Sequence, residues 1–172
     1  MKKLSLFLAP ALLLLSPLVF STTAVANEPK LVSKHGNWAT YSRHDGDNKI
    51  CYALSEPQNK SPKSVRHGDI YFMVANWKSG AALEQPSFLA GYNLKTTSPP
   101  KARIGSSNYR MYVSQNEAFI EDGSDEKALV KNMRAGSSMR VEAVSQRGTA
   151  VTYSFSLSGV TAALNAARSA CR

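Results

Sequence analysis

The feature that most constrains this chain is its pair of cysteines. Cys51 and Cys171 are the only two in 172 residues, and most of the chain lies between them. In a protein that leaves the cytoplasm, an even cysteine count indicates a structural disulfide. A free thiol pair or a metal site is the alternative, but two isolated cysteines lack the paired Cys-x-x-Cys spacing of zinc sites. A Cys51–Cys171 bond would stabilise the fold by roughly 4–5 kcal/mol, because it closes a long loop in the unfolded chain.

Residues 1–26 have the features of a cleaved secretory signal peptide. Lys2 and Lys3 precede an apolar run over 4–20, and Ala24-Val25-Ala26 gives the small-x-small pattern that signal peptidase recognises. An uncleaved anchor is the alternative, although the run is short and interrupted by two prolines. No other segment is apolar enough to cross a bilayer, so we expect no stable membrane span after cleavage.

The remaining chain has the length of one ordinary domain. We expect a loose, polar lead-in over 27–35 and a single domain over 36–172. Two of the 21 basic residues and none of the 12 acidic residues lie in the leader, which leaves a formal charge of +7. This charge favours polyanionic partners such as anionic lipid, lipopolysaccharide, acidic glycans or nucleic acid. A basic composition is also common among exported proteins, so charge alone does not select a partner.

A period of two dominates the domain and predicts a mainly β fold. Turn residues at 45–48, 105–108 and 147–148 separate several of the apolar alternations, and 55–62 has two prolines and reads as a loop. Strands are expected at 38–42, 49–54, 70–77, 88–94, 101–104, 109–114, 117–121, 139–145 and 150–157. Short strands with closely spaced turns are typical of an antiparallel β-sandwich.

Two short helices accompany these strands. The first follows Ser124, the expected N-cap, carries acidic residues in its first turn and Arg134 near its end, and stops at Gly136. The second is C-terminal and starts at Val160.

The C-terminal helix carries one apolar stripe. Val160, Ala163, Leu164, Ala167 and Cys171 recur at helical spacing, so Cys171 faces the same side as the stripe. We therefore expect this helix to lie over the sheet face that carries Cys51, with the disulfide buried beneath it.

Candidate catalytic and metal residues do not form a recognisable set. His35, His44 and His67 stand apart, and the turn after His44 fails as a calcium loop because Ile50 occupies the obligatory glycine position. No Gly-x-Ser-x-Gly elbow occurs. The acidic cluster at 121–126 is explained by a turn leading into a helix. We assign no catalytic, cofactor-binding or metal-binding residue, and an enzyme with a dispersed polar site stays as an alternative.

Six basic residues are candidates for a contact surface, and tyrosines lie near three of them. Lys60, Lys63 and Arg66 crowd one loop, and Lys101, Arg103 and Arg110 flank Tyr109 and Tyr112. Positive charge beside aromatic rings is how single-stranded nucleic acid is held. A solvated charged face is the alternative, and no specific nucleic acid is predicted.

A series of short motifs runs in order along the chain. They are Gly36-Asn37-Trp38 before Cys51, Gly68-Asp69-Ile70-Tyr71-Phe72, Gly91-Tyr92-Asn93-Leu94, the helix 127–133 with Arg134-Ala135-Gly136, Ser145-Gln146-Arg147-Gly148-Thr149, and Ser156-Leu157-Ser158-Gly159 before the alanine-rich helix that ends at Cys171. In order and spacing the chain resembles the invasion-associated locus B family of exported proteins of Gram-negative bacteria. It departs at Phe119, where family members often have Trp.

The resemblance implies an immunoglobulin-like antiparallel β-sandwich in the periplasm or outer envelope, or secreted. No catalytic residues are carried over from the family. The leading hypothesis is a non-enzymatic envelope protein that acts through surface contacts with a protein or a polyanionic envelope or host component, in host-cell interaction or invasion. A polyanion-binding envelope protein and an enzyme with a dispersed site are the alternatives.

Overall fold

The computed structural model describes residues 28–172. The predicted signal peptide and its cleavage site lie outside the described residues. Within 28–172, no helix is long and apolar enough to cross a membrane.

Antiparallel strands make up most of the described chain, as predicted. The strands are β1 (Lys30–His35), β2 (Trp38–Asp45), β3 (Asn48–Ser55), β4 (Asn59–Ser61), β5 (Tyr71–Trp77), β6 (Gln85–Leu89), β7 (Lys101–Ile104), β8 (Ser107–Ser114), β9 (Glu117–Ile120), β10 (Ser138–Val144) and β11 (Ala150–Ser156); the helices are α1 (Gly123–Ala135) and α2 (Val160–Ala170). Hydrogen bonding joins the strands in the order β1-β2-β3-β5-β6-β9-β8-β7-β10-β11-β4.

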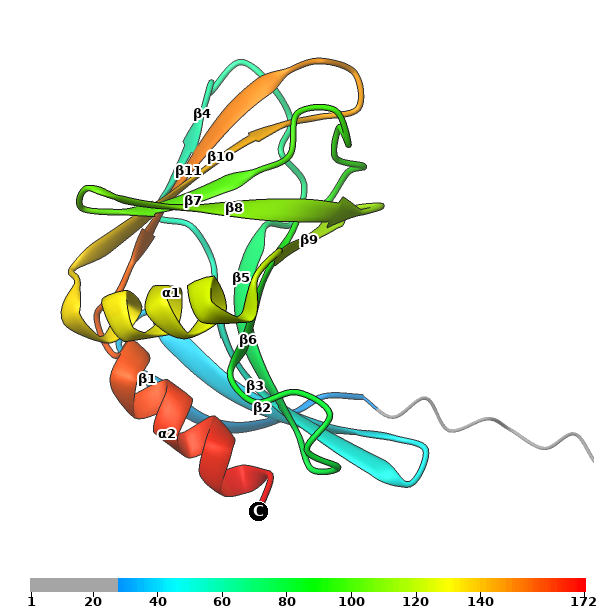
Figure 1. Ribbon diagram of the computed structural model, residues 1–172, viewed down its shortest axis with the longest axis vertical. Coiled ribbons are helices and arrows are strands. Elements are labelled where there is room, and N and C mark those ends of the chain that lie inside the picture. Colours follow the sequence, from blue (N-terminus) through cyan, green and yellow to red (C-terminus); the bar gives the residue numbers. More distant parts are fainter. Residues whose placement is uncertain (1–27) are drawn as a thin grey trace, which may run out of the picture.

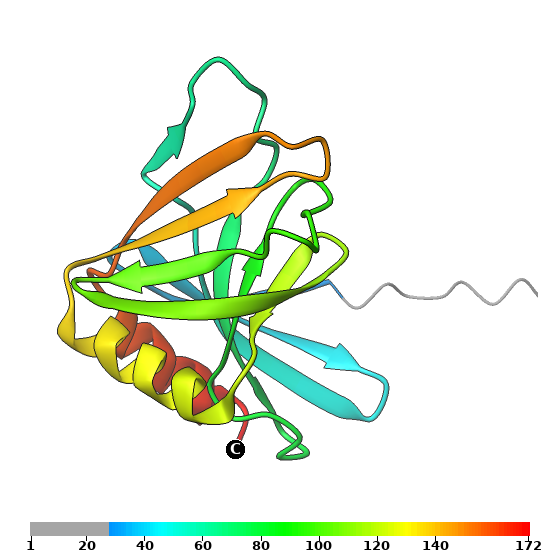
Figure 2. The same cartoon turned by 45° about the horizontal axis from the view of Figure 1, so that its top comes forward.

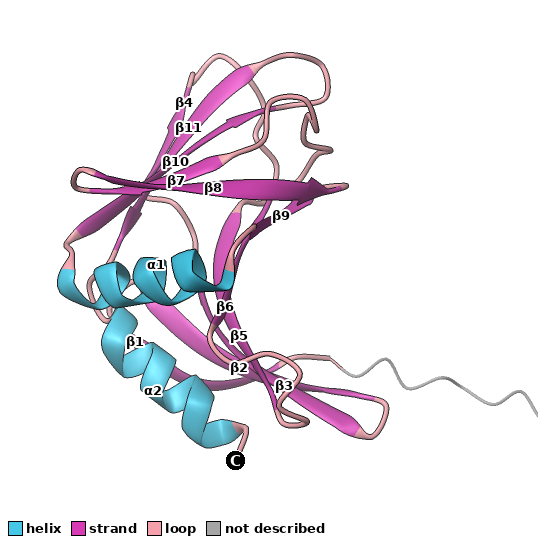
Figure 3. Ribbon diagram, viewed as in Figure 1, coloured by secondary structure: helices cyan, strands magenta, loops and turns pink. Residues whose placement is uncertain are grey.

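Strand β8 turns this sheet into a sandwich. Its first half pairs with β7, from Ser107 to Arg110, and its second half pairs with β9, from Met111 to Ser114. The strands on either side of β8 therefore form two layers, drawn in magenta in Figure 3. In Figure 1 the upper layer (β7, β10, β11 and β4) lies above α1, and the lower layer runs from β9 and β5, beside α1, to β6, β3, β2 and β1 below it. The predicted sandwich class is confirmed.

Aromatic side chains fill the space between the layers. Phe72 of the lower layer meets Phe155 of the upper one with ring centroids 5.9 Å apart, and Phe88 meets Tyr153 at 5.6 Å. All four are buried. Edge-to-face and tilted contacts of this kind contribute beyond the apolar area that they bury.

The two helices lie close together at one end of the sandwich (Figure 2). α1 buries Leu129, Val130 and Met133 against the core. Its N-cap is Asp122, whose carboxylate accepts from the backbone N–H of Ser124, so the predicted Ser124 cap is wrong. Aspartate is an equally good cap, and the helix begins two residues earlier than the pattern indicated.

α2 covers the inner face of β1, β2 and β3. The Thr40 hydroxyl donates to the Ala163 carbonyl at 3.0 Å, and the buried apolar stripe is the predicted one. Cys171 follows the helix and is bonded to Cys51 of β3, with Cα atoms 5.6 Å apart. Cys51 is fully buried. The expected position of the disulfide beneath the last helix is therefore confirmed.

Two glycines allow the turn between β1 and β2 to lie against the segment between β11 and α2. Gly36 and Gly159 both have positive φ, at 56° and 88°. A Cβ atom on Gly36 would lie 2.7 Å from the Ser158 carbonyl oxygen, and one on Gly159 would overlap the His35 carbonyl oxygen. Only residues without a side chain fit this crossing.

The structure differs from the sequence interpretation at three strands. The expected loose lead-in 27–35 contains β1, which pairs with β2 although its Leu31 and Val32 are exposed. The 55–62 loop contains β4, a short edge strand on β11. The strand expected at 88–94 is β6, at 85–89. β1 and β4 are paired on one side only, to β2 and β11, so their position depends on the neighbouring strand rather than on an apolar alternation of their own.

Candidate functional site

The outer face of the lower layer holds a groove lined mostly by apolar and aromatic side chains. Its volume is about 360 Å³, and we call it the aromatic groove. It is lined by Pro29, Arg43, Ile50, Tyr52, Met73, Ala75, Trp77, Gln85, Ser87, Leu89, Glu117 and Phe119. The β register explains its composition, because Tyr52 faces Ala75, Met73 faces Ser87, and Ser87 faces Phe119 across adjacent strands. Side chains at these positions share one face of the sheet.

Stacked aromatic pairs lie on both sides of the groove. Tyr41 and Tyr52 stack with centroids 5.7 Å apart, and Tyr112 and Phe119 stack at 5.6 Å. Tyr112 is 48% exposed. Burial raises the pKa of Tyr52, which stays a neutral hydroxyl near pH 7. The four rings therefore present flat apolar surfaces, and the three tyrosines each add a hydroxyl group.

Three of the six predicted basic residues lie together on the outer face of the upper layer. Lys101 pairs directly with Arg110, and Arg103 pairs with Arg140 of β10. All four side chains are exposed. We call Lys101, Arg103, Arg110 and Arg140 the basic strip; Glu142, which pairs with Lys101, is an acidic neighbour on the same face.

The basic strip continues into the aromatic groove through β8. Tyr112 follows Arg110 by two residues and so points to the same face. Tyr112 stacks on Phe119, which lines the groove. The result is one outer surface, positively charged over the upper layer and apolar over the lower layer.

The other three predicted basic residues lie elsewhere. The ammonium group of Lys60 donates to the Gly68 carbonyl at 3.2 Å, and Lys63 is exposed in the loop that follows β4. Arg66 lines a different cavity. Sequence reasoning missed Arg140, because the pairing of β10 with β7 joins segments that are distant along the chain.

That different cavity, the loop pocket, has a volume of about 410 Å³. It is lined by Val65, Arg66, His67, Tyr92, Ser145, Arg147, Thr149 and Val151. Tyr153 is buried behind it and hydrogen-bonds to the His67 Nδ1 atom at 2.9 Å and to the Tyr92 hydroxyl at 2.7 Å. Burial raises the pKa of both tyrosines, so they are neutral hydroxyls at physiological pH.

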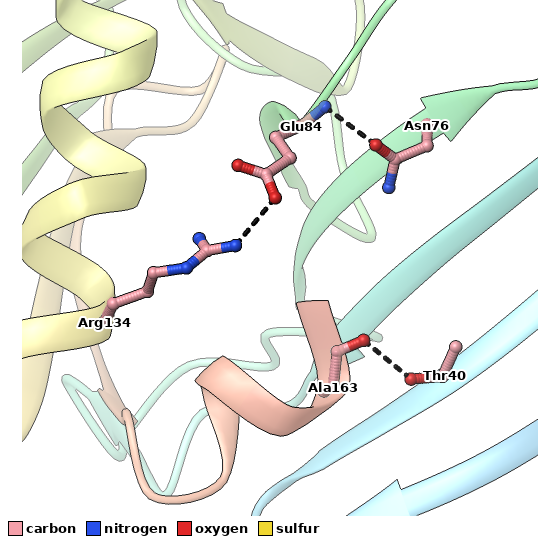
Figure 4. A network of polar contacts seen from close by, with 5 residues as sticks. All are labelled: Thr40, Asn76, Glu84, Arg134 and Ala163. Atoms are coloured by element: carbon pink, nitrogen blue, oxygen red, sulfur yellow. Dashed lines mark hydrogen bonds and ion pairs between the residues drawn. The ribbon is translucent and has the colours of Figure 1, made fainter. Parts of the chain in front are cut away.

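A smaller cavity of about 200 Å³ lies beside α1 and α2. At its edge Glu84 forms an ion pair with Arg134 of α1 at 2.7 Å, and the Glu84 N–H donates to the Asn76 side-chain oxygen at 3.1 Å (Figure 4). The Nδ2 group of Asn76 is buried without a partner among the described residues. These contacts fix the loop between β5 and β6 against α1.

The predicted acidic cluster and histidines do not assemble a metal site in the described part of the chain. Asp122 caps α1, and hydrogen bonds from Ser124 hold its pKa below the usual value. His35 bonds to Ser33, His44 is exposed in β2, and His67 lies in the loop pocket.

Fold and surface together define a mainly β sandwich protein, closed by two helices and one disulfide, with a continuous outer surface of charged and aromatic residues. The profile of the invasion associated locus B (IalB) protein family matches residues 38–168, and the chain belongs to this family. The crystal structure of invasion associated protein B from Bartonella henselae matches with a TM-score of 0.57 at 14% sequence identity, over 82% of this chain and 98% of that chain. No curated protein sequence matches this chain.

Proposed function

We propose that this protein is an exported, non-enzymatic envelope protein that binds the acidic surface of a lipid membrane through its outer face. The main support for this proposal is that the basic strip continues into the aromatic groove. Acidic head groups are attracted to the strip, and apolar lipid segments fit the rings beside it. The invasion-associated name of the family supports a role in contact between surfaces.

The charge distribution supports a lipid surface as the partner. Lys101, Arg103, Arg110 and Arg140 lie on three neighbouring strands and so present their charges to one plane. Tyrosine side chains favour membrane interfaces because one end of the ring is apolar and the other is hydrated. Tyr41, Tyr52 and Tyr112 meet this description on the same face.

Vesicle sedimentation tests the proposal. The protein lacking residues 1–26 is mixed with vesicles of neutral phosphatidylcholine or with vesicles containing anionic phosphatidylglycerol, at low and high salt. We expect binding only to anionic vesicles and a steep loss with salt, because exposed charges are screened over about 8 Å at physiological ionic strength. Equal binding to both vesicle types, or none, would overturn the proposal.

Matched variants separate the outer face from overall charge. The triple variant Arg103→Gln, Arg110→Gln, Arg140→Gln should weaken binding roughly 100-fold, at about 1 kcal/mol for each basic residue near the membrane. The control variant removes three exposed charges from the helical side, Lys127→Gln, Lys131→Gln and Arg168→Gln, and should bind nearly as well as the original.

The aromatic groove is tested by Tyr52→Ser and Tyr112→Ser. These variants should weaken vesicle binding while heparin binding, which needs only charge, stays the same. If heparin binds tightly and vesicles do not, the partner is a polyanion without an apolar part. Turnover in a panel of hydrolase substrates, abolished by one substitution in a pocket, would contradict the non-enzymatic assignment.

A further inference from the structure

The loop pocket is formed where three loops meet. Arg66 and His67 come from the loop between β4 and β5, Tyr92 from the segment after β6, and Arg147 from the turn between β10 and β11. In Figure 1 this last turn lies at the top of the molecule, beside the segment that follows β6. The pocket is therefore separate from both the basic strip and the aromatic groove.

The lining of the loop pocket carries positive charge and hydroxyl groups. Arg66 and Arg147 are exposed, and no carboxylate is among the lining residues. Across residues 28–172, the ion pair found is Arg134 with Glu84, so neither of these guanidinium groups is neutralised by a carboxylate. Two uncompensated guanidinium groups beside serine and threonine hydroxyls match the donor set that binds phosphate or sulfate oxygens.

Backbone contacts hold the three loops in place. A Cβ atom on Gly91 would lie 2.7 Å from the Asp69 nitrogen and 3.0 Å from the Gly68 Cα atom, so the loops carrying His67 and Tyr92 touch backbone to backbone. The Gln146 N–H donates to the Asn93 carbonyl at 2.8 Å, which ties the β10–β11 turn to the segment after Tyr92. The pocket is preformed, which lowers the entropy cost of binding a ligand.

The hydrogen bonds behind the pocket have a direction that can be deduced. His67 Nε2 lies 2.9 Å from the Pro62 carbonyl oxygen, which can only accept, so Nε2 carries a hydrogen. In neutral His67 the Nδ1 atom is then an acceptor, and Tyr153 donates to it. Tyr153 in turn accepts from Tyr92, so the hydrogen of Tyr92 points inward, away from any ligand.

Protonation of His67 reverses this chain. Nδ1 then donates to Tyr153, Tyr153 donates to Tyr92, and the Tyr92 hydroxyl hydrogen is released from its inward bond. Tyr92 lines the pocket and can then donate to a ligand. A neutral histidine and an anion donor at Tyr92 therefore exclude each other.

From this geometry we infer that the loop pocket binds the phosphate or sulfate group of a small molecule through Arg66, Arg147 and the Tyr92 hydroxyl, and that binding is coupled to proton uptake by His67. The volume of the pocket falls in the range of small-molecule sites. Because the Tyr92 hydroxyl can donate to a ligand only when His67 is protonated, we expect affinity to rise as the solution is acidified from pH 8 to pH 5.5.

The charged groups around His67 also affect its protonation. Arg66, Arg147 and the ammonium group of Lys60, bonded to the Gly68 carbonyl, bring positive charge from the pocket and from β4. Asp69 follows in the loop and is exposed. The two tyrosines stay neutral over the tested range because burial raises their pKa values. An anion in the pocket offsets the positive charges and so favours protonated His67.

Isothermal titration with sodium sulfate tests the coupling, because sulfate keeps a constant charge over the whole range. We expect binding about tenfold tighter at pH 5.5 than at pH 8, the effect of one additional hydrogen bond to an anion. Inorganic phosphate and glucose 6-phosphate, both at pH 5.5, compare a free anion with one carried by a larger molecule. Absence of binding by all three probes would overturn the inference.

Variants identify the residues. Arg66→Gln with Arg147→Gln should abolish sulfate binding, whereas Arg168→Gln on α2 should leave it unchanged. His67→Gln should remove the pH dependence, and a tenfold change retained in that variant would overturn the coupling.

Tyr153→Phe separates the hydrogen-bond chain from the simple charge of His67. Without the Tyr153 hydroxyl, Tyr92 is free to donate at any pH, so the affinity at pH 8 should rise to within about threefold of the original protein at pH 5.5. A Tyr153→Phe protein that is folded, by circular dichroism, but binds sulfate at pH 8 no better than the original would refute the chain reversal.

Discussion

Reduction of the Cys51–Cys171 disulfide should lower the free energy of unfolding by about 5 kcal/mol. The bond joins residues 120 positions apart. A cross-link that closes a loop of this length lowers the entropy of the unfolded chain, which is worth about 5 kcal/mol of stability at 25 °C. Reduction restores that entropy to the unfolded chain. Since single domains are stable by about 5–15 kcal/mol in total, the reduced protein should be close to its limit of stability.

The native state should change little on reduction. Cys51 is fully buried and Cys171 nearly so, and we expect both thiols to remain enclosed by the same neighbours after a small separation of the sulfur atoms. α2 also remains attached by its buried stripe and by the bond from Thr40 to Ala163. The effect should therefore arise in the unfolded chain, which expands when the cross-link is removed.

Urea unfolding followed by circular dichroism, with and without reductant, measures the difference. We expect a lower midpoint and a larger m-value for the reduced protein, because more surface becomes exposed on unfolding. The Cys51→Ala, Cys171→Ala double variant is the control for the reductant itself and should be insensitive to it. If mass spectrometry shows full reduction and the stability falls by less than about 1 kcal/mol, the loop-closure reasoning is wrong for this fold.

Three further predictions concern stability. Gly159→Ala should lower the free energy of unfolding by at least about 2 kcal/mol more than Gly148→Ala does. Both glycines have φ near 90°, but only a Cβ atom at position 159 would overlap neighbouring backbone. Similar urea midpoints for the two variants would contradict this close approach. Phe72→Ala, at a fully buried ring, should cost about 3–5 kcal/mol by chemical unfolding, and a loss under 1 kcal/mol would mean that the layers pack differently. Hydrogen bonds from Ser124 lower the pKa of Asp122, so the carboxylate contributes its full stabilisation above the usual aspartate pKa and loses it as the pH falls through the lowered value. The stability of Asp122→Ala should therefore depend less on pH between pH 6 and pH 3. An unchanged pH dependence would argue against the cap.

The sequence predicted those parts of the structure that depend on local pattern. The alternation of apolar and polar residues predicted the hairpin of β10 and β11, and helical spacing predicted that Cys171 lies on the buried side of α2. It failed where pattern is absent, because β1 and β4 are polar edge strands that exist only by pairing with a neighbour. The cap of α1 was misplaced by two residues, since Asp122 and Ser124 are both good caps and only the backbone geometry distinguishes them.

The candidate sites were less accessible from sequence. The basic residues could be grouped only by their nearness in the sequence. The structure keeps Lys101, Arg103 and Arg110 together in the basic strip, but it separates Lys60, at the Gly68 contact, from Arg66, in the loop pocket. From the sequence, Arg147 and Tyr92 appear only as parts of family motifs and Tyr153 only as a strand residue, because nothing in their spacing indicates that three separate loops converge.

By itself, then, the sequence determined the mainly β class, the last helix with its inward cysteine, and the strand faces on which basic and aromatic side chains lie. These follow from side-chain periodicity, which is set within a few residues by backbone geometry. Tertiary structure alone decided that β8 pairs with β7 along one half and β9 along the other, which joins the basic strip to the aromatic groove. Such pairings link distant segments, and their register depends on the packing of the whole sheet rather than on any local pattern.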